Sequence, residues 1–301
     1  MKVSYDYCEL MSMIDSTLLA PTATGEEIEK LCQDALKYGF KAVVVNPVHV
    51  KTCKKILKDT KVKVSTVAGF PLGEDLTKVK LYEVKRACKE GAEEIDVVLC
   101  ISAAKAGNWK AVGQEIKKIV KAAKRRRLVK VILEASYLTD EEIERACKIC
   151  VEAGARFVKT GTGYAGDATT EHVALMSRAV KAQLSEMSNK NDLKRCEVKA
   201  AAGIRTYEQA LALAEAGATR IGTSRAAEIA EEGAKAAQIE QRAETAAAQE
   251  SGEAGVEPAD WETKAAEAEK RGEEAAERET AREEEPQPLE EESPPITIDG
   301  L

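Results

Sequence analysis

Aromatic residues and long apolar runs are both scarce in this chain of 301 residues. Aromatics are 4% of the residues while hydrophobic residues together are 44%, so a core must be built from Val, Ile, Leu and Ala. No stretch approaches the roughly 18 uninterrupted apolar residues of a membrane span. The first residues, MKVSYDYCELMSMIDST, lack the basic and then apolar segments of a secretory signal. These absences argue against a membrane or exported protein, and we expect a cytoplasmic one.

Metal-binding and redox motifs are scarce as well. The two histidines, His49 and His172, have no second histidine or acid at ligand spacing, so we expect no metal site. The eight cysteines have no secretory context that would favour a disulfide framework. Cys147 and Cys150 form a CxxC without a second pair at zinc spacing, and we interpret them as buried helix residues.

Charge is divided unevenly along the chain. Residues 226–301 contain 23 acidic and 7 basic residues, a net charge of −16, while residues 1–225 contain 29 acidic and 38 basic residues, a net charge of +9. A mildly basic body suits an anionic small-molecule substrate. It has no stripe of Lys and Arg interleaved with aromatics, which disfavours nucleic acid as a partner.

The aliphatic pattern stops near Glu232. We predict one folded domain over residues 1–232 and a low-complexity tail rich in Ala and Glu over residues 233–301. The tail has too few apolar residues to offset the entropy of ordering, so we expect disorder with transient helix. A solvated appendage is the favoured interpretation over a partner-binding or solubilising tail.

Between residues 13 and 225, short β-branched runs alternate with longer amphipathic stretches, which is typical of strand–helix units with a parallel sheet. The eight runs are Met13–Asp15, Ala42–Asn46, Val62–Val67, Glu94–Leu99, Val129–Glu134, Arg156–Thr160, Cys196–Ala200 and Thr219–Thr223. Eight units in about 225 residues predict an α/β fold of the closed (β/α)8, or TIM barrel, type. The alternative is an open doubly wound sheet, but the segment DSTLLAPTATG after the first run lacks the GxGxxG expected there.

Local signals place the ends of several helices. A threonine is followed three residues later by Glu or Gln at Thr24, Thr139 and Thr206, the pattern of a capping box. Glycines that end helices before the next run stand at positions 39, 91, 154 and 217.

Polar residues interrupt the apolar runs, mostly near the ends of the predicted strands. They are Asp15, Asn46, Ser65, Thr66, Asp96, Glu134, Lys159 and Lys199. Because catalytic groups of such barrels lie at the carboxyl ends of strands, we expect these side chains to meet at one mouth.

Lys159 and Lys199, on adjacent predicted strands, favour Schiff-base chemistry. A free lysine has a pKa near ~10.4, which leaves about one part in 10³ neutral at pH 7. Lowering this pKa by roughly 3 units takes about 4 kcal/mol, and burial with a second cation nearby acts in that direction. Lys159 would be the nucleophile and Lys199 the cation. Asp96 would either move protons or pair with a lysine, and the two roles are compatible.

Small residues precede two predicted helix starts, in Ala200–Thr206 and Gly222–Arg225. Backbone N–H groups at such helix starts bind phosphate, and in barrels this is its usual place. The sequence therefore predicts a site for a phosphorylated substrate.

The segments that carry these residues resemble the deoxyribose-phosphate aldolases in unbroken order over about residues 10–230. They are DSTLLAPTAT, VNPVHV, VAGFPLG, EIDVVL, KVILEASYLTDEEI, FVKTGTG, VKAAAGIRT and GATRIGTS. The resemblance implies a class I aldolase that cleaves 2-deoxy-D-ribose 5-phosphate reversibly to D-glyceraldehyde 3-phosphate and acetaldehyde, without metal or organic cofactor. It would be a carbon–carbon lyase of deoxyribonucleoside and carbohydrate catabolism.

By the same resemblance, Lys159 matches the Schiff-base lysine, Lys199 the lysine that perturbs it and Asp96 the proton-transfer aspartate. Phosphate or substrate positions are matched by Asp15, Gly163, Gly203, Gly222 and Ser224. The oligomeric state is not fixed by the sequence, and a homodimer is compatible with it.

The chain departs from the family pattern at several positions. Many relatives have histidine where Ser16 stands, serine where Gly161 stands and glycine where Ala202 stands. Some end in a tyrosine that reaches the active site, whereas this chain has no tyrosine after Tyr207. Substrate range and rate are therefore open, although no reacting group is lost.

Two other functions stay open at this point. The same Schiff-base chemistry would serve a different pair of aldehydes. Alternatively, the barrel would be an inactive scaffold whose acidic tail recruits a partner, and the intact Lys159, Lys199 and Asp96 argue against that.

Overall fold

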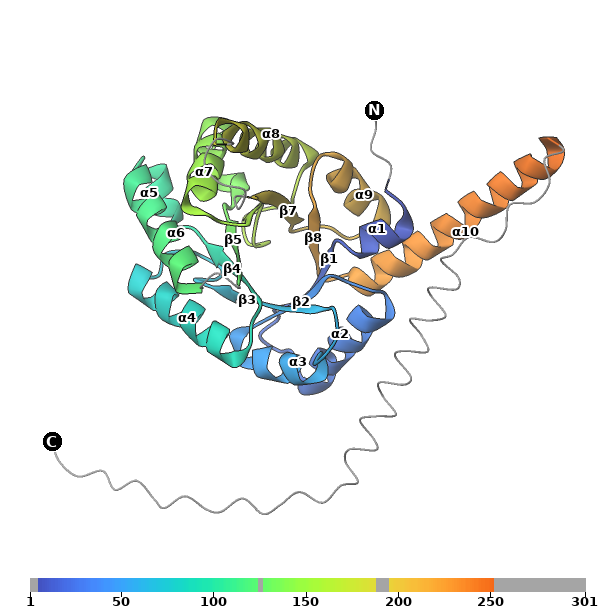
Figure 1. The fold of residues 1–301 in the computed structure, drawn as a ribbon, viewed down its shortest axis with the longest axis horizontal. Helices are drawn as coiled ribbons and strands as arrows, with labels where there is room; N and C mark the ends of the chain where they lie inside the picture. The colour runs from blue at the N-terminus through green and yellow to red at the C-terminus, as the bar shows by residue number, and fades with distance from the viewer. Residues whose placement is uncertain (1–4, 124–126, 188–194, 252–301) are drawn as a thin grey trace, which may run out of the picture.

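Eight parallel strands close into a barrel in chain order (Figure 1). The computed structural model describes residues 5–123, 127–187 and 195–251. The strands are β1 (Ile14–Leu18), β2 (Ala42–Val45), β3 (Lys63–Ala68), β4 (Glu94–Val98), β5 (Leu128–Ile132), β6 (Phe157–Lys159), β7 (Glu197–Ala201) and β8 (Arg220–Thr223). The barrel closes because β1 pairs with both β2 and β8, with Asp15 beside Ala42 on one side and Gly222 on the other. The (β/α)8 prediction is confirmed, and the open sheet is excluded.

Helices surround the barrel as an outer ring (Figure 1). They are α1 (Tyr7–Met11), α2 (Gly25–Lys37), α3 (Val50–Ile56), α4 (Thr77–Glu90), α5 (Ile101–Lys105), α6 (Trp109–Ala123), α7 (Asp140–Ala153), α8 (Thr170–Glu186), α9 (Tyr207–Glu215) and α10 (Ala226–Ser251), with short 3-10 turns η1 (Pro47–His49) and η2 (Ala135–Tyr137). No helix in the described ranges is both long and apolar enough to cross a membrane.

The predicted capping signals form as expected. Thr24, Thr139 and Thr206 each accept a hydrogen bond from the third residue of the following helix, whose side chain accepts one from the cap in return. Gly91 and Gly154 end their helices with φ of 109° and 88°, a conformation that glycine adopts without strain.

Side chains alternate between two environments along each strand. Outward-facing residues such as Ile95 and Val97 belong to the aliphatic core between the barrel and the helices. Cys147 and Cys150 are fully buried in α7 within this core, as predicted. The inward-facing residues of the same strands, such as Glu94 and Asp96, are buried and charged. The barrel interior is therefore the polar centre of the molecule.

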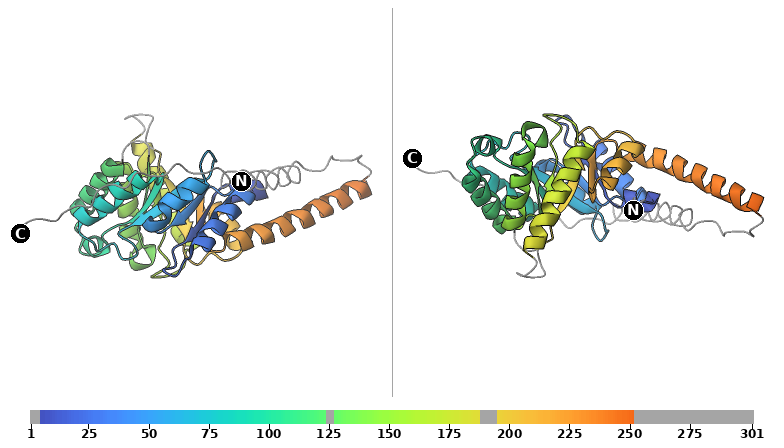
Figure 2. Two further views of the ribbon diagram at one scale, coloured as in Figure 1. Left: turned by 90° about the horizontal axis from the view of Figure 1, so that it is seen from below. Right: turned by 90° about the horizontal axis from the view of Figure 1, so that it is seen from above.

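Helix α10 extends past residue 232, where the sequence predicts disorder with transient helix. Ala226, Ile229 and Ala230 are buried against the barrel, and the helix then continues away from it to Ser251 (Figure 2). Its outer part consists mainly of Ala, Glu, Gln and Arg, which have high helix propensity, and this explains a helix where the sequence has few apolar residues. Residues 252–301 lie outside the described residues, so the boundary at residue 232 and the disordered tail stay predictions.

Candidate active site

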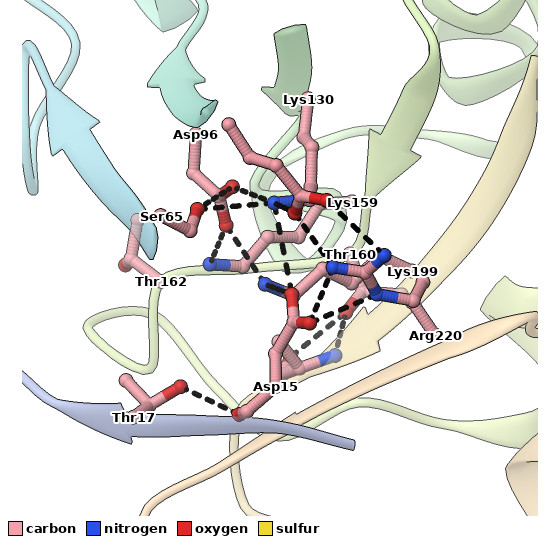
Figure 3. A network of polar contacts seen from close by, with 12 residues as sticks. Asp15, Thr17, Ser65, Asp96, Lys130, Lys159, Thr160, Thr162, Lys199 and Arg220 are labelled. Carbon is pink, nitrogen blue, oxygen red and sulfur yellow. Dashed lines mark hydrogen bonds and ion pairs between the residues drawn. The ribbon is translucent and has the colours of Figure 1, made fainter. Parts of the chain in front are cut away.

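Seven charged side chains from six strands, three acids and four bases, meet inside the barrel (Figure 3). None has more than 4% of its surface exposed. We call this group the interior charge cluster, and it consists of Asp15, Glu94, Asp96, Lys130, Lys159, Lys199 and Arg220.

The two lysines singled out in the sequence share one carboxylate oxygen. Lys159 is the last residue of β6, and its Nζ lies 3.1 Å from Asp96 Oδ2. Lys199 lies beside it in the register of β7, and its Nζ is 2.9 Å from the same oxygen. The structure thus brings together the three side chains to which the sequence assigned the chemistry.

The environment of Lys159 favours a free amine. Burial is the largest cause that lowers the pKa of Lys159 from its ordinary value to about 8. The Asp96 carboxylate opposes this change, while the ammonium groups of Lys199 and Lys130 reinforce it. At a pKa of about 8, about one amine in ten is uncharged at pH 7, against about three in 10⁴ at the ordinary value.

Asp96 is the hub of the cluster. Its Oδ1 accepts hydrogen bonds from Lys130 Nζ at 2.9 Å and from Ser65 Oγ at 3.4 Å. Its Oδ2 accepts hydrogen bonds from Lys159 Nζ and Lys199 Nζ. Burial alone would raise the pKa of Asp96, but the three ammonium groups hold it well below its usual value. Asp96 is therefore held in its carboxylate form.

The sequence suggested that Asp15 ends its strand, but the structure places it elsewhere. It is the second residue of β1 and is fully buried, with Lys199 Nζ at 2.5 Å and Arg220 at 2.5 Å from its oxygens. Asp96 and Lys199 also lie within their strands. They meet because inward-facing side chains of the strands fill a common barrel interior. A residue that lies before the end of its strand can therefore still contact the others.

Sequence reasoning missed three members of the cluster, namely Glu94, Lys130 and Arg220. Lys130 Nζ lies 2.6 Å from Glu94 Oε2, which also lies 2.6 Å from Arg220. The period of two in a strand would have revealed Glu94, because it must face the same side as Asp96 two residues later. The same alternation separates Lys130 and Arg220 from their apolar neighbours.

The loop that follows Lys159 is held by Glu134. This residue lies two positions after β5 with φ of 54°, is 1% exposed and accepts hydrogen bonds from the backbone N–H and the hydroxyl of Thr162. A Cβ on Gly161 would lie 2.7 Å from Glu134 Oε1. Glycine in place of the family's serine thus makes room for this carboxylate.

The glycines predicted to bind phosphate divide into two groups. A Cβ on Gly163 would lie 3.9 Å from that of Ala202, so the loops after β6 and β7 approach each other at these residues. Gly203 follows Ala202, and Ser224 is exposed before α10. Gly222 is different, because a Cβ there would lie 2.8 Å from Lys199 Cε, which places it against the lysine side chain.

These loops are joined by backbone contacts. Ala168 N–H donates to Ala202 O at 2.9 Å, and Thr223 Oγ1 donates to Ile204 O at 2.7 Å. The loops after β6, β7 and β8 therefore form one connected rim.

A pocket of about 310 Å³ opens at the same mouth. Its walls come from the loops that follow strands β3 to β6, and they are Pro71, Leu72, Glu74, Ile101, Ser102, Glu134, Tyr137 and Tyr164. Across the residues that the structure describes, no group of three or more His, Cys, Asp and Glu side chains is arranged to hold a metal ion.

Several known proteins with similar sequences and structures are aldolases. The family model of the DeoC/LacD family aldolases matches residues 9–256. A deoxyribose-phosphate aldolase of Carboxydothermus hydrogenoformans is 49% identical over 220 residues, 72% of this chain and 91% of its own length. One from Thermococcus gammatolerans is 48% identical over 227 residues, 74% of this chain and 96% of its own length.

Solved structures agree. A putative deoxyribose-phosphate aldolase of Coccidioides immitis has a TM-score of 0.70 at 37% identity, over 76% of this chain and 87% of its own. The enzyme of Aeropyrum pernix, described as a unique tetramer, has a TM-score of 0.68 at 36% identity, over 75% of this chain and 91% of its own. The chain belongs to the DeoC/LacD aldolase family.

Proposed function

We propose that this protein catalyses the reversible aldol cleavage of 2-deoxy-D-ribose 5-phosphate to D-glyceraldehyde 3-phosphate and acetaldehyde, through a Schiff base on Lys159. Family membership supports the reaction. The observation that carries the residue assignment is the shared oxygen of Asp96, with Lys159 Nζ at 3.1 Å and Lys199 Nζ at 2.9 Å.

The first step is attack of the uncharged Lys159 amine on the C1 aldehyde of the sugar. The addition product loses water to give a protonated imine, for which a proton must reach the departing hydroxyl. Lys199, on the neighbouring strand β7, is the ammonium donor in this proposal because it shares Asp96 Oδ2 with Lys159. Asp96 holds both nitrogens on one side of the interior and keeps them aligned.

The second step breaks the C2–C3 bond. A base removes the proton of the C3 hydroxyl, the bond electrons move onto C2, and the imine becomes a neutral enamine as glyceraldehyde 3-phosphate leaves. We assign this proton transfer to Asp96, acting through a water molecule, and the support is its contact with Lys159 Nζ at 3.1 Å. Protonation of C2 and hydrolysis of the imine then release acetaldehyde and regenerate the Lys159 amine.

The connected rim of loops after β6, β7 and β8 is our proposed phosphate site, with Gly163, Gly203 and Ser224 as contacts. Its support is the small residues at this rim and the start of α10 at Ala226, where backbone N–H groups and the helix dipole favour an anion. Gly222 has a packing role against Lys199 in this proposal.

Acetaldehyde release from 2-deoxy-D-ribose 5-phosphate tests the proposal, with the wild type compared to Lys159→Ala. An exposed lysine far from the cluster, in Lys105→Ala, is the control. We expect the wild type and the control to release acetaldehyde and Lys159→Ala to fall to background. Full activity in Lys159→Ala would overturn the assignment. Turnover of other phosphorylated sugars in preference to this one would instead favour a different pair of aldehydes.

A further inference from the structure

The interior charge cluster contains more cations than anions. Its acids are Asp15, Glu94 and Asp96, and its bases are Lys130, Lys159, Lys199 and Arg220. With every group ionised, three negative charges face four positive ones in a space from which water is largely excluded. An unbalanced buried charge costs free energy, and this lowers the pKa of the base that is least stabilised as a cation.

The ion pairs show which base has the fewest carboxylate partners. Lys130 contacts Glu94 at 2.6 Å, Asp96 at 2.9 Å and Asp15 at 3.7 Å. Arg220 contacts Asp15 and Glu94, and Lys199 contacts Asp15 and Asp96. Lys159 has a single ion pair, with Asp96, within the described part of the chain.

We propose that Arg220, which contacts neither Lys159 nor Asp96, raises the uncharged fraction of Lys159 by adding a fourth cation to a cluster with three anions. It is a positioning residue that acts through the carboxylates of Asp15 and Glu94. This role rests on the proposed function, because Lys159 must be the nucleophile for its charge to matter to the reaction.

The contacts explain why Arg220 is suited to this role. Two of its guanidinium nitrogens donate hydrogen bonds to Glu94, and the third donates one to Asp15. The guanidinium carbon also lies 5.5 Å from the centre of the Phe157 ring. Burial works against its charge, but Asp15 and Glu94 raise the pKa of Arg220 above an already high value. Arg220 therefore stays positively charged, and Lys159 is the base of the cluster that loses its proton most readily.

The same surplus acts on the second chemical step. A protonated imine on Lys159 carries one positive charge, as the ammonium did, while the enamine is neutral. An excess of positive charge around this nitrogen therefore favours movement of the C2–C3 bond electrons toward it. Arg220 would assist both the formation of the amine and the cleavage of the bond.

All charged groups around Lys159 enter this balance. Asp96 on β4, Lys130 on β5 and Lys199 on β7 act on it directly. Asp15 and Glu94 contact these lysines, and Arg220 contacts the carboxylates of Asp15 and Glu94. On the loop side, the Glu134 carboxylate is engaged by Thr162 and has no contact with the interior charge cluster among the described residues. Arg220→Gln and Glu94→Gln each remove one of these charges and leave the others in place.

The test is the titration of Lys159 in the full chain without any sugar. Trace labelling with acetic anhydride between pH 6 and 11 reports the uncharged fraction, measured by mass spectrometry of the Lys159 peptide with exposed Lys105 as internal reference. We expect a wild-type midpoint near pH 8. Arg220→Gln should raise the midpoint by about one pH unit, the order of magnitude for removing one charge from a buried cluster without breaking a direct contact. Arg220→Lys keeps the charge and should leave the midpoint unchanged.

Glu94→Gln changes the balance in the opposite direction and should lower the midpoint. The double variant Glu94→Gln with Arg220→Gln restores a surplus of one and should return the midpoint toward the wild-type value. An unchanged midpoint in folded Arg220→Gln, or a raised or unchanged midpoint in Glu94→Gln, overturns the proposal. If Arg220→Gln does not fold, Glu94→Gln and the double variant decide. Failure of the proposed function would appear separately, as absent acetaldehyde release with the titration shifts intact.

Discussion

Replacing Lys199 by methionine removes the ammonium group that shares Asp96 Oδ2 with Lys159. Three effects then act in one direction on Lys159. The repulsion between the two ammonium groups disappears, Asp96 Oδ2 bonds to Lys159 alone, and the cluster has three anions and three cations with Lys159 protonated. The pKa of Lys159 should therefore rise from about 8 toward its ordinary value of 10.5.

The size of the effect follows from the uncharged fraction at pH 7. A pKa of about 8 leaves about one amine in ten uncharged, and a pKa of 10.5 leaves about three in 10⁴, so the upper limit of the loss is about 300-fold. Burial remains in the variant and keeps part of the lowering, because it is the largest cause. We expect imine formation at pH 7 to fall by roughly 10- to 300-fold and to recover as the pH approaches 10.

The assay is the rate at which borohydride traps the acetaldehyde imine of Lys159 between pH 6 and 10. Lys80→Met is a matched control, because Lys80 is also fully buried and pairs at 2.8 Å with a carboxylate, that of Glu115, outside the cluster. Its pH profile should match that of the wild type. A Lys199→Met trapping rate at pH 7 within twofold of the wild type would refute the reasoning.

Three further changes have definite expected results. Ala202 has φ of 93°, so Ala202→Gly should raise the free energy of unfolding by about 1 kcal/mol in denaturant titrations, and a decrease would contradict the strain at this position. The Asp167 carboxylate lies against Gly203, where a Cβ would be 2.0 Å from its Cγ, so Asp167→Asn should lower KM severalfold for the phosphorylated sugar but not for 2-deoxyribose. Equal changes in both KM values would reject a phosphate site at this rim. Gly222→Ala places a Cβ 2.8 Å from Lys199 Cε and should reduce kcat at least tenfold in a protein with an unchanged circular dichroism spectrum.

The barrel was predictable because its signals are local. Eight β-branched runs and the capping boxes at Thr24, Thr139 and Thr206 lie within short windows of sequence, and each defines one element. After residue 232 the local signals conflict, since few apolar residues argue against packing but a helix of Ala and Glu needs little packing to form. A homodimer and a cytoplasmic location stay predictions.

The site was predictable only in part because its contacts join distant residues. Lys159 and Lys199 could be linked through adjacent strands, but Arg220 and Asp15 are 205 positions apart and meet only when the barrel closes. The contact between Asp167 and Gly203 depends on the path of a loop, which residue types do not specify. Charge balance is likewise a property of the assembled interior and not of any one strand.

One mass measurement tests the central claim most directly. The protein is incubated with 2-deoxy-D-ribose 5-phosphate, reduced with borohydride and digested, and the peptide that contains Lys159 is sequenced by mass spectrometry. The account predicts a stable adduct on the Lys159 nitrogen that is absent when borohydride is left out. An adduct confined to Lys130, Lys199 or another lysine, with Lys159 unmodified, would contradict it.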